Sequence, residues 1–294
     1  MTQSRTSHPL GDSPALRRAV AGLASIFGLR MLGLFMILPV FSLYADGLQG
    51  YSPILAGFAI GAYGLTQALL QIPFGMLSDR IGRKPVITAG LLVFAVGSVV
   101  AATSDHIFGV IAGRALQGAG AIAAAIMALT ADLTPDEHRT KAMAVIGMSI
   151  GLAFFASLVA GPVVGHWLGL AGIFWLTAVL ALGGIVVLHT VVPDPAHSRV
   201  HRDAEPVPAQ FSRVLRDTQL LRLDLGIMLL HLMMTSTFVA LPLALRDYAG
   251  VSAGSHWQVY LGVLVVAVVV MVPFVILAER RRQMKAVFVG AVAA

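Results

Sequence analysis

The chain contains no cysteine, and only 12% of its 294 residues are charged. The absence of cysteine excludes thiol catalysis, disulfide bonds and thiolate metal sites. A soluble domain is about 25% charged, so this chain has too few polar groups to cover a water-exposed surface. Its hydrophobic residues, 57% of the total, are gathered in long runs. This pattern predicts that lipid surrounds most of the chain.

Carboxylates are also missing from the middle of every long apolar run. The sequence has no intramembrane carboxylate pair and no H-E-x-x-H, G-x-S-x-G or Walker pattern. We therefore expect neither an enzyme nor an ATP-driven pump, and no cofactor or metal site. The net charge is +6, but the basic residues lie in short segments between apolar runs and not on one face. That distribution argues against nucleic-acid binding and is typical of membrane topology signals.

Eight segments reach the roughly 20 apolar residues that a membrane-spanning helix needs. The expected spans are Ala19–Tyr44, Pro53–Leu77, Pro85–Thr103, Ile107–Leu133, Ala142–Leu168, Leu170–Val192, Leu223–Leu245 and Gln258–Ala278. A ninth run begins at Ala286 and reaches the last residue, Ala294. It is too short to cross a bilayer, so we expect either a fragment or a truncated reading frame.

Lysine and arginine are distributed very unevenly between the two sides of this arrangement. Seventeen of the 20 lie in the N-terminal segment and the even-numbered loops, Arg246 alone lies on the other side, and Arg30 and Arg114 lie within spans. Since positive residues accumulate on the cytoplasmic side, we expect a multi-pass protein of the cell inner membrane with a cytoplasmic N-terminus. Residues 1–18 are the expected tail, 19–192 a six-helix bundle, 193–222 a proline-containing linker and 223–294 an incomplete second bundle.

An internal repeat supports two bundles. Similar features recur at offsets of 203, 200 and 201 residues: Leu38-Pro39 with Leu241-Pro242, Asp79-Arg80 with Glu279-Arg280, and Arg30 with His231. A near-constant offset indicates that span seven restarts the pattern of span one. Repeated six-helix halves are a recurring transporter design, so the expected fold is all-α, with two six-helix bundles of which eight spans and a stub of the ninth are present here.

The loop between spans two and three carries the most specific motif. It reads Gly75-Met-Leu77-Ser-Asp79-Arg80-Ile-Gly82-Arg83-Lys84. Gly75 allows close helix approach and Gly82 permits a tight turn. The segment resembles the signature loop of the major facilitator superfamily. The resemblance implies a conformational latch formed by these residues, with a partner on the C-terminal half, and we expect Asp132, at the end of span four, to belong to it.

Two further motifs extend the resemblance: the one in span four resembles a motif of the family, and the one in span five resembles a motif of its drug:proton antiporter branch. Span four contains Arg114, Gln117 and Gly118 in the pattern R-x-x-Q-G; the alternative is a structural arginine that bonds neighbouring carbonyl groups. Span five contains Gly161, Pro162 and Gly165, a packing face with a kink. Ser157 and His166 stand where glycine is usual in that branch. Together with the first-span motif around Arg30, the sequence is similar to the YajR-type bacterial inner-membrane transporters.

Proton coupling requires a titratable group near the middle of the membrane. His231 is central in span seven, on one helical face with Asp224 and Thr235, and histidine can change charge near neutral pH. The repeat places Arg30 at the equivalent site of the first half, where it is expected to face His231 and tune it. A buried, hydrogen-bonded structural histidine is the alternative. Tyr63, Gln67 and Gln71 recur every fourth residue in span two and are expected to face the central cavity or a helix interface.

These features predict a secondary transporter that exports amphipathic small molecules by proton-coupled alternating access. Uptake or uniport of a small solute is an alternative within the same class, and a non-functional fragment is another. The expected partners are a small-molecule substrate, protons and the lipid bilayer, with no nucleic acid, and we expect a monomer.

Overall fold

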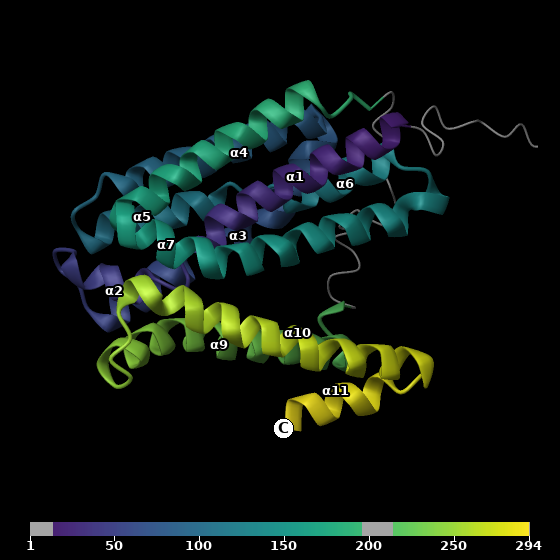
Figure 1. Ribbon diagram of the computed structural model, residues 1–294. Coiled ribbons are helices and arrows are strands. Elements are labelled where there is room, and N and C mark those ends of the chain that lie inside the picture. The colour runs from purple at the N-terminus through teal and green to yellow at the C-terminus, as the bar shows by residue number, and fades with distance from the viewer. Residues whose placement is uncertain (1–13, 196–213, 294) are drawn as a thin grey trace, which may run out of the picture.

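The computed structural model describes residues 14–195 and 214–293, and almost all of them are helical (Figure 1). The helices of the first half are α1 (Pro14–Met36), α2 (Phe41–Tyr44), η1 (Ala45–Gly47), α3 (Pro53–Ile81), α4 (Arg83–Ala102), α5 (Ile107–Ala119), α6 (Ala123–Leu133) and α7 (Asp136–Thr190). Those of the second half are α9 (Thr218–Asp247), η2 (Ala253–Ser255), α10 (His256–Arg280) and α11 (Met284–Ala293).

Seven helical segments in the described ranges are long and apolar enough to cross a membrane. One of them, α7, contains 55 residues and bends back at Gly169, whose φ of 66° and ψ of −170° are not helical. Glycine tolerates this conformation because it lacks a Cβ. With α7 divided there, the eight predicted spans and the all-α membrane fold are confirmed.

Two helices begin earlier in the sequence than the expected bundles. Helix α1 already begins at Pro14, inside the expected tail of residues 1–18, and α9 begins at Thr218, inside the expected linker. The side chain of Asp217 caps α9 by accepting from the backbone N–H groups of Gln219 and Leu220. The rest of the tail and the linker residues 196–213 lie outside the described residues.

Two spans that were predicted to be continuous are interrupted. The first ends at Met36 and resumes as the short α2 after a turn that contains Pro39, which has no backbone N–H to donate. The fourth is divided into α5 and α6 at residues 120–122, where the backbone N–H of Gly120 bonds the carbonyl groups of Leu116 and Gln117. Such breaks are tolerated at membrane depth only when other protein groups satisfy the released carbonyls.

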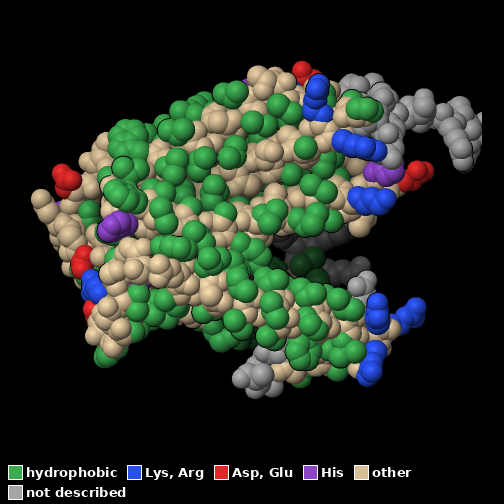
Figure 2. Space-filling view, in the orientation of Figure 1, with side chains coloured by type: hydrophobic (Ala, Val, Ile, Leu, Met, Phe, Trp, Pro, Cys, Tyr) green, Lys and Arg blue, Asp and Glu red, His purple; other side chains and the backbone are tan. Residues whose placement is uncertain are grey.

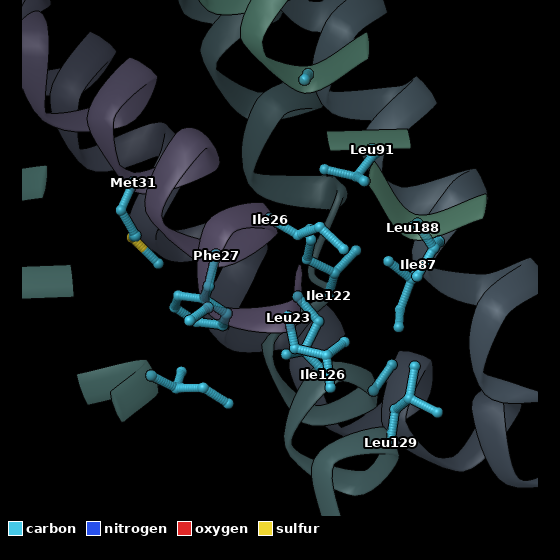
Figure 3. Packing of buried hydrophobic residues seen from close by; sticks show 14 of the residues in the cluster. Leu23, Ile26, Phe27, Met31, Ile87, Leu91, Ile122, Ile126, Leu129 and Leu188 are labelled. Atoms are coloured by element: carbon cyan, nitrogen blue, oxygen red, sulfur yellow. The ribbon is translucent and has the colours of Figure 1, made fainter. Parts of the chain in front are cut away.

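A continuous apolar core holds the first half together (Figure 3). Leu23, Ile26 and Phe27 of α1 meet Ile87 and Leu91 of α4, Ile122, Ile126 and Leu129 of the fourth span, and Leu188 at the end of α7. The second half is much less covered: the most apolar windows of α9 and α10 are each 6% buried, compared with 56% for α1. The first half is therefore the well-packed body against which α9 and α10 lie.

The two halves touch at one end of the helices and separate towards the other. Tyr260 of α10 donates to the carbonyl of Pro39, and Arg246 of α9 pairs with Asp46 of η1. We call this the closed end. Figure 2 shows a hollow between the halves that opens towards the opposite end, where Lys and Arg side chains gather on both halves. We call that the open end.

The repeat seen in the sequence is reproduced in the backbone at an offset of 200 residues. Gly50 and Gly250 both have positive φ, of 71° and 64°. Ser52 and Ser252 both stand at the N-cap of the helix that follows. Pro73 and Pro273 both lie inside a helix, α3 and α10 respectively. The first two spans of each half therefore share one local design.

The close packing of α4 on α5 depends on two glycines, which gives a test of the fold. A Cβ on Gly113 would lie 2.6 Å from the Gly97 carbonyl oxygen and 2.7 Å from the Ala101 nitrogen. Gly113→Ala should therefore destabilise the protein by about 1–3 kcal/mol through overpacking, measured as a lower melting temperature in detergent. Gly147→Ala is the matched control, because a Cβ there meets nothing within 4 Å. Equal melting temperatures for the two variants would contradict this packing.

Candidate functional site

The motif between α3 and α4 forms an ion-pair cluster at the open end. Arg83 pairs with Asp79 one turn earlier, donates to the Ser78 hydroxyl at 2.7 Å, and pairs with Asp132 of α6 at 3.2 Å. The side chains of Arg83 and Asp132 are 4% and 0% exposed. A buried arginine is stable only when it is paired and hydrogen-bonded, and this one joins three helices. We call Ser78, Asp79, Arg83 and Asp132 the latch cluster.

The other motif residues shape the backbone around this cluster. Gly82 adopts φ 98° between α3 and α4, and a Cβ on Gly75 would lie 3.2 Å from the Cβ of Ala124. Lys84 reaches the end of α7, where it donates to the Val192 carbonyl at 2.6 Å and pairs with Asp194 at 2.9 Å. Arg80 and Leu77 are exposed. The turn and the close approach expected of the two glycines are both present.

The span-four motif forms a chain of hydrogen bonds inside the first half. Arg114 donates to the Gln117 amide oxygen at 2.7 Å, and the Gln117 amide nitrogen donates to Ser98 of α4, also at 2.7 Å. Arg114 further donates to the Ala59 carbonyl of α3 at 3.4 Å and lies over the Tyr63 ring. Gly118 has no room for a side chain against the Tyr63 backbone. This geometry matches the structural alternative, an arginine that ties neighbouring helices together.

Arg30 is 1% exposed and lies inside the first half. It donates to the Gln67 amide oxygen at 2.9 Å and to the Gly120 carbonyl at 3.2 Å, and it lies against the rings of Phe94 and Tyr63. The Gly120 carbonyl belongs to the break between α5 and α6, so Arg30 satisfies a group that the break releases. Tyr63 donates to Gln67, while Gln71 is half-buried one turn further along α3.

The span-five motif is a packing surface for the first span. A Cβ on Gly165 would lie 3.0 Å from the Tyr44 ring, and one on Gly161 would overlap the Met36 carbonyl oxygen and the Pro39 ring. Pro162 lies inside α7 and is buried. Ser157 is also buried and donates to the carbonyl of Phe154, and His166 lies against Gly254 of the second half. The motif therefore holds α7 against the turn at Pro39.

One face of α9 is turned towards the first half. Phe238 packs edge-on against Phe154 of α7 at a centroid distance of 5.9 Å, and Phe154 packs in the same way against Phe35 of α1 at 5.2 Å. Thr235 and His231 lie one and two turns from Phe238 along this face, towards the open end. Asp224 lies two further turns along and is exposed. His231 is exposed as well, and its Nδ1 lies 2.9 Å from the Ile227 carbonyl.

The expected pairing of Arg30 with His231 was wrong in geometry. Arg30 points into the first half, towards Gln67 and Gly120, whereas the described contact of His231 is with its own helix. The sequence offset predicts that the two residues lie at equivalent depths in the membrane. It does not predict the direction in which each side chain points from its helix. Tyr63 and Gln67 likewise face a helix interface inside the first half, one of the two placements that their spacing allowed.

The residues through which the two halves touch were not among those predicted from the sequence. The aromatic contacts of Phe35, Phe154 and Phe238 come from three helices that are far apart in the chain. No local pattern marks them, since phenylalanine is common along the spans. Asp46 and Arg246 carried a signal that could have been used, because they are opposite charges separated by the repeat distance of 200 residues.

Comparison with known proteins agrees with this architecture. The family model described as Major Facilitator Superfamily matches residues 23–294. The inner membrane transport protein YajR of Escherichia coli is 55% identical over 94% of this chain and 61% of its own length. The multidrug resistance protein MdtH of Yersinia enterocolitica is 28% identical over 78% of this chain and 56% of its own length. The chain thus spans about three fifths of these curated relatives.

Solved structures show the same fold. A bacterial homologue of the human lysosomal transporter Spinster, in an inward-facing and unoccupied conformation, superposes with a TM-score of 0.71 at 15% identity, covering 92% of this chain and 64% of the other. The human organic anion transporter MFSD10 gives 0.60 at 23% identity, covering 85% of this chain and 70% of the other. The family model, the relatives and the fold together show that this chain belongs to the Major Facilitator Superfamily of membrane transporters.

Proposed function

We propose that the full-length protein exports amphipathic small molecules across the bacterial inner membrane in exchange for protons, by alternating access. The observation that carries this proposal is the hollow between the two halves, sealed at the closed end and open where the Lys and Arg side chains gather (Figure 2). The positive-inside rule makes that open end cytoplasmic. The state is then one in which a substrate enters from the cytoplasm.

The lining of this hollow supports an amphipathic substrate. Phe35, Phe154 and Phe238 are half-buried near its sealed end, and aromatic rings offer large apolar contact areas. Thr235 and His231 follow on the α9 face with polar groups. A molecule with an apolar body and a polar group would match this order. The similarity to a relative named as a multidrug resistance protein points in the same direction.

His231 is the proposed proton carrier. A carbonyl oxygen only accepts hydrogen bonds, so the contact with Ile227 places the hydrogen of a neutral imidazole on Nδ1. The other ring nitrogen, Nε2, is then left with its lone pair on an exposed side chain. We propose that this accessible lone pair, on a histidine that shares a helical face with Phe238, is the group that accepts the proton. Arg30 acts in this proposal as a fixed structural charge inside the first half.

His231→Gln should abolish substrate-induced proton flux in the full-length protein, because glutamine cannot change charge. The measurement is the pH change in proteoliposomes on substrate addition, over a range of pH. His189→Gln is the matched control. His189 is exposed on the first half, and its Nε2 lies 3.0 Å from Thr88 Oγ1. Flux with unchanged pH dependence in the His231 variant would assign this histidine a structural role.

The latch cluster is the proposed conformational switch at the cytoplasmic end. Two carboxylates hold one buried guanidinium there, so the turn between α3 and α4 is fixed relative to α6. In our proposal the exposed part of Asp79, which is 21% exposed, also meets the second half when the halves close at this end. The cluster would then stabilise the outward-facing state.

Asp79→Asn should lower the transport rate by about ten- to hundredfold, since a hydrogen bond to a charged group contributes about 1.5–3 kcal/mol and 1.36 kcal/mol is tenfold in rate. Membrane insertion should be unaffected, as judged by protein levels and solubility in detergent. Asp136→Asn is the control: Asp136 pairs with Arg139 on the same side but is 87% exposed. If the Asp79 variant transports at the rate of the unmodified protein, the loop is only a topology signal.

A further inference from the structure

Asp46 and Arg246 occupy equivalent positions of the repeat. They are 200 residues apart, which is the offset that relates Gly50 to Gly250, Ser52 to Ser252 and Pro73 to Pro273. Asp46 lies in the short helix that follows the first span, and Arg246 lies in the last turn of α9. The two halves thus place opposite charges four residues before the positive-φ glycine of each half.

These two side chains meet at the closed end. Arg246 Nη1 lies 3.2 Å from Asp46 Oδ2, and Arg246 Nε lies 2.7 Å from Asp247 Oδ1 on its own helix. In a two-fold arrangement, a residue touches its own equivalent only beside the symmetry axis. A contact between equivalent residues is therefore expected beside the axis that relates the two halves. Like charges at these positions would repel each other on closure, and opposite charges attract.

A second contact lies on the inner side of this pair. The turn at Pro39 releases a backbone carbonyl, and the Tyr260 hydroxyl of α10 donates to it at 3.4 Å. Tyr260 is 5% exposed, whereas Asp46 and Arg246 have side chains that are 48% and 41% exposed. The charged pair is the outer, water-accessible layer over a buried contact, which is the arrangement expected of a gate.

We propose that Asp46 and Arg246 form a clasp that stabilises the state closed at this end and that breaks each time the halves open there. The inference rests on the alternating-access function proposed above. Exposed ion pairs are weak, so this one biases the balance between the two states by about two- to fivefold. A weak contact suits the role, because a transporter has to break it in every cycle. Salt should weaken the clasp further by screening.

The test is a double-mutant cycle read out by chemical labelling. The reporter is Thr235→Cys in a cysteine-free, full-length background, labelled with a membrane-impermeant maleimide from the side on which Gln49→Cys reacts. The reporter lies behind the clasp and reacts from that side only when the clasped end is open. Asp46→Asn and Arg246→Gln should each raise its labelling rate about two- to fivefold. The double variant should show the same increase as either single variant, and not their product, because the two residues act as one interaction.

Asp105→Asn is the matched control. It removes a negative charge at the same end. The contact between Asp105 and Gln49 is made by the backbone, because the Asp105 carbonyl accepts from the Gln49 N–H at 2.9 Å. The reporter cysteine should be labelled at the same rate in the Asp105→Asn variant as in the protein that carries the reporter alone. The clasp is refuted if the single variants label at the unmodified rate, or if their effects multiply in the double variant. Failure of the proposed function looks different: transport and proton flux would be absent in the full-length protein that retains Thr235, while the labelling pattern still followed the cycle.

Discussion

Polar groups inside a bilayer have to find their partners within the protein, and this constraint fixes the first half as a rigid body. Arg30 fills the break between α5 and α6 by bonding the Gly120 carbonyl, and it holds Gln67 of α3 at the same time. Arg114 links α3 to α4 through Gln117 and Ser98. If α1 or α5 moved relative to its neighbours, these charges would lose partners in a medium that supplies none. Fewer polar contacts join the two halves within residues 14–195 and 214–293, so motion between the halves has the lower energetic cost.

The contacts between the halves have the character that such a motion requires. Near the middle they are aromatic, with Phe238 packed against Phe154, and apolar surfaces can separate and meet again without leaving a charge unpaired. Towards the closed end they include a buried hydroxyl contact and an exposed ion pair. The strongly paired charges lie elsewhere, in the latch cluster inside the first half. The strong pairs of the latch cluster hold the first half together, and the described polar contacts between the halves are weaker.

The sequence predicted the number of spans, the repeat and the fold, because hydropathy and the distribution of Lys and Arg act over long windows and tolerate local irregularity. It could not predict the breaks at residues 120–122 and around Pro39, since both depend on tertiary partners that accept or donate at those points. The ion pair of Arg83 with Asp132 was anticipated only as membership of one cluster. The pairing of Arg30 with His231 failed because the offset gives height along the membrane normal and not the direction of a side chain.

The two halves also show how a repeat is put to different uses. Equivalent positions keep the features that shape the backbone, such as the positive-φ glycines at 50 and 250 and the prolines at 73 and 273. The side chains at equivalent positions differ: Arg30 is buried inside the first half, whereas His231, 201 residues later, is exposed. The shared backbone therefore carries side chains in different environments in the two halves.

The central claim is that the two halves rock as bodies between a state closed at one end and a state closed at the other. Its most direct test is a pair of spin-label distances in the full-length protein in nanodiscs. One pair joins Gln49→Cys to Tyr248→Cys at the closed end, and the other joins Lys141→Cys to Arg281→Cys at the open end. On a change of pH or addition of substrate, the account predicts that one distance lengthens as the other shortens. Two distances that stay fixed, or that lengthen and shorten together, would contradict it.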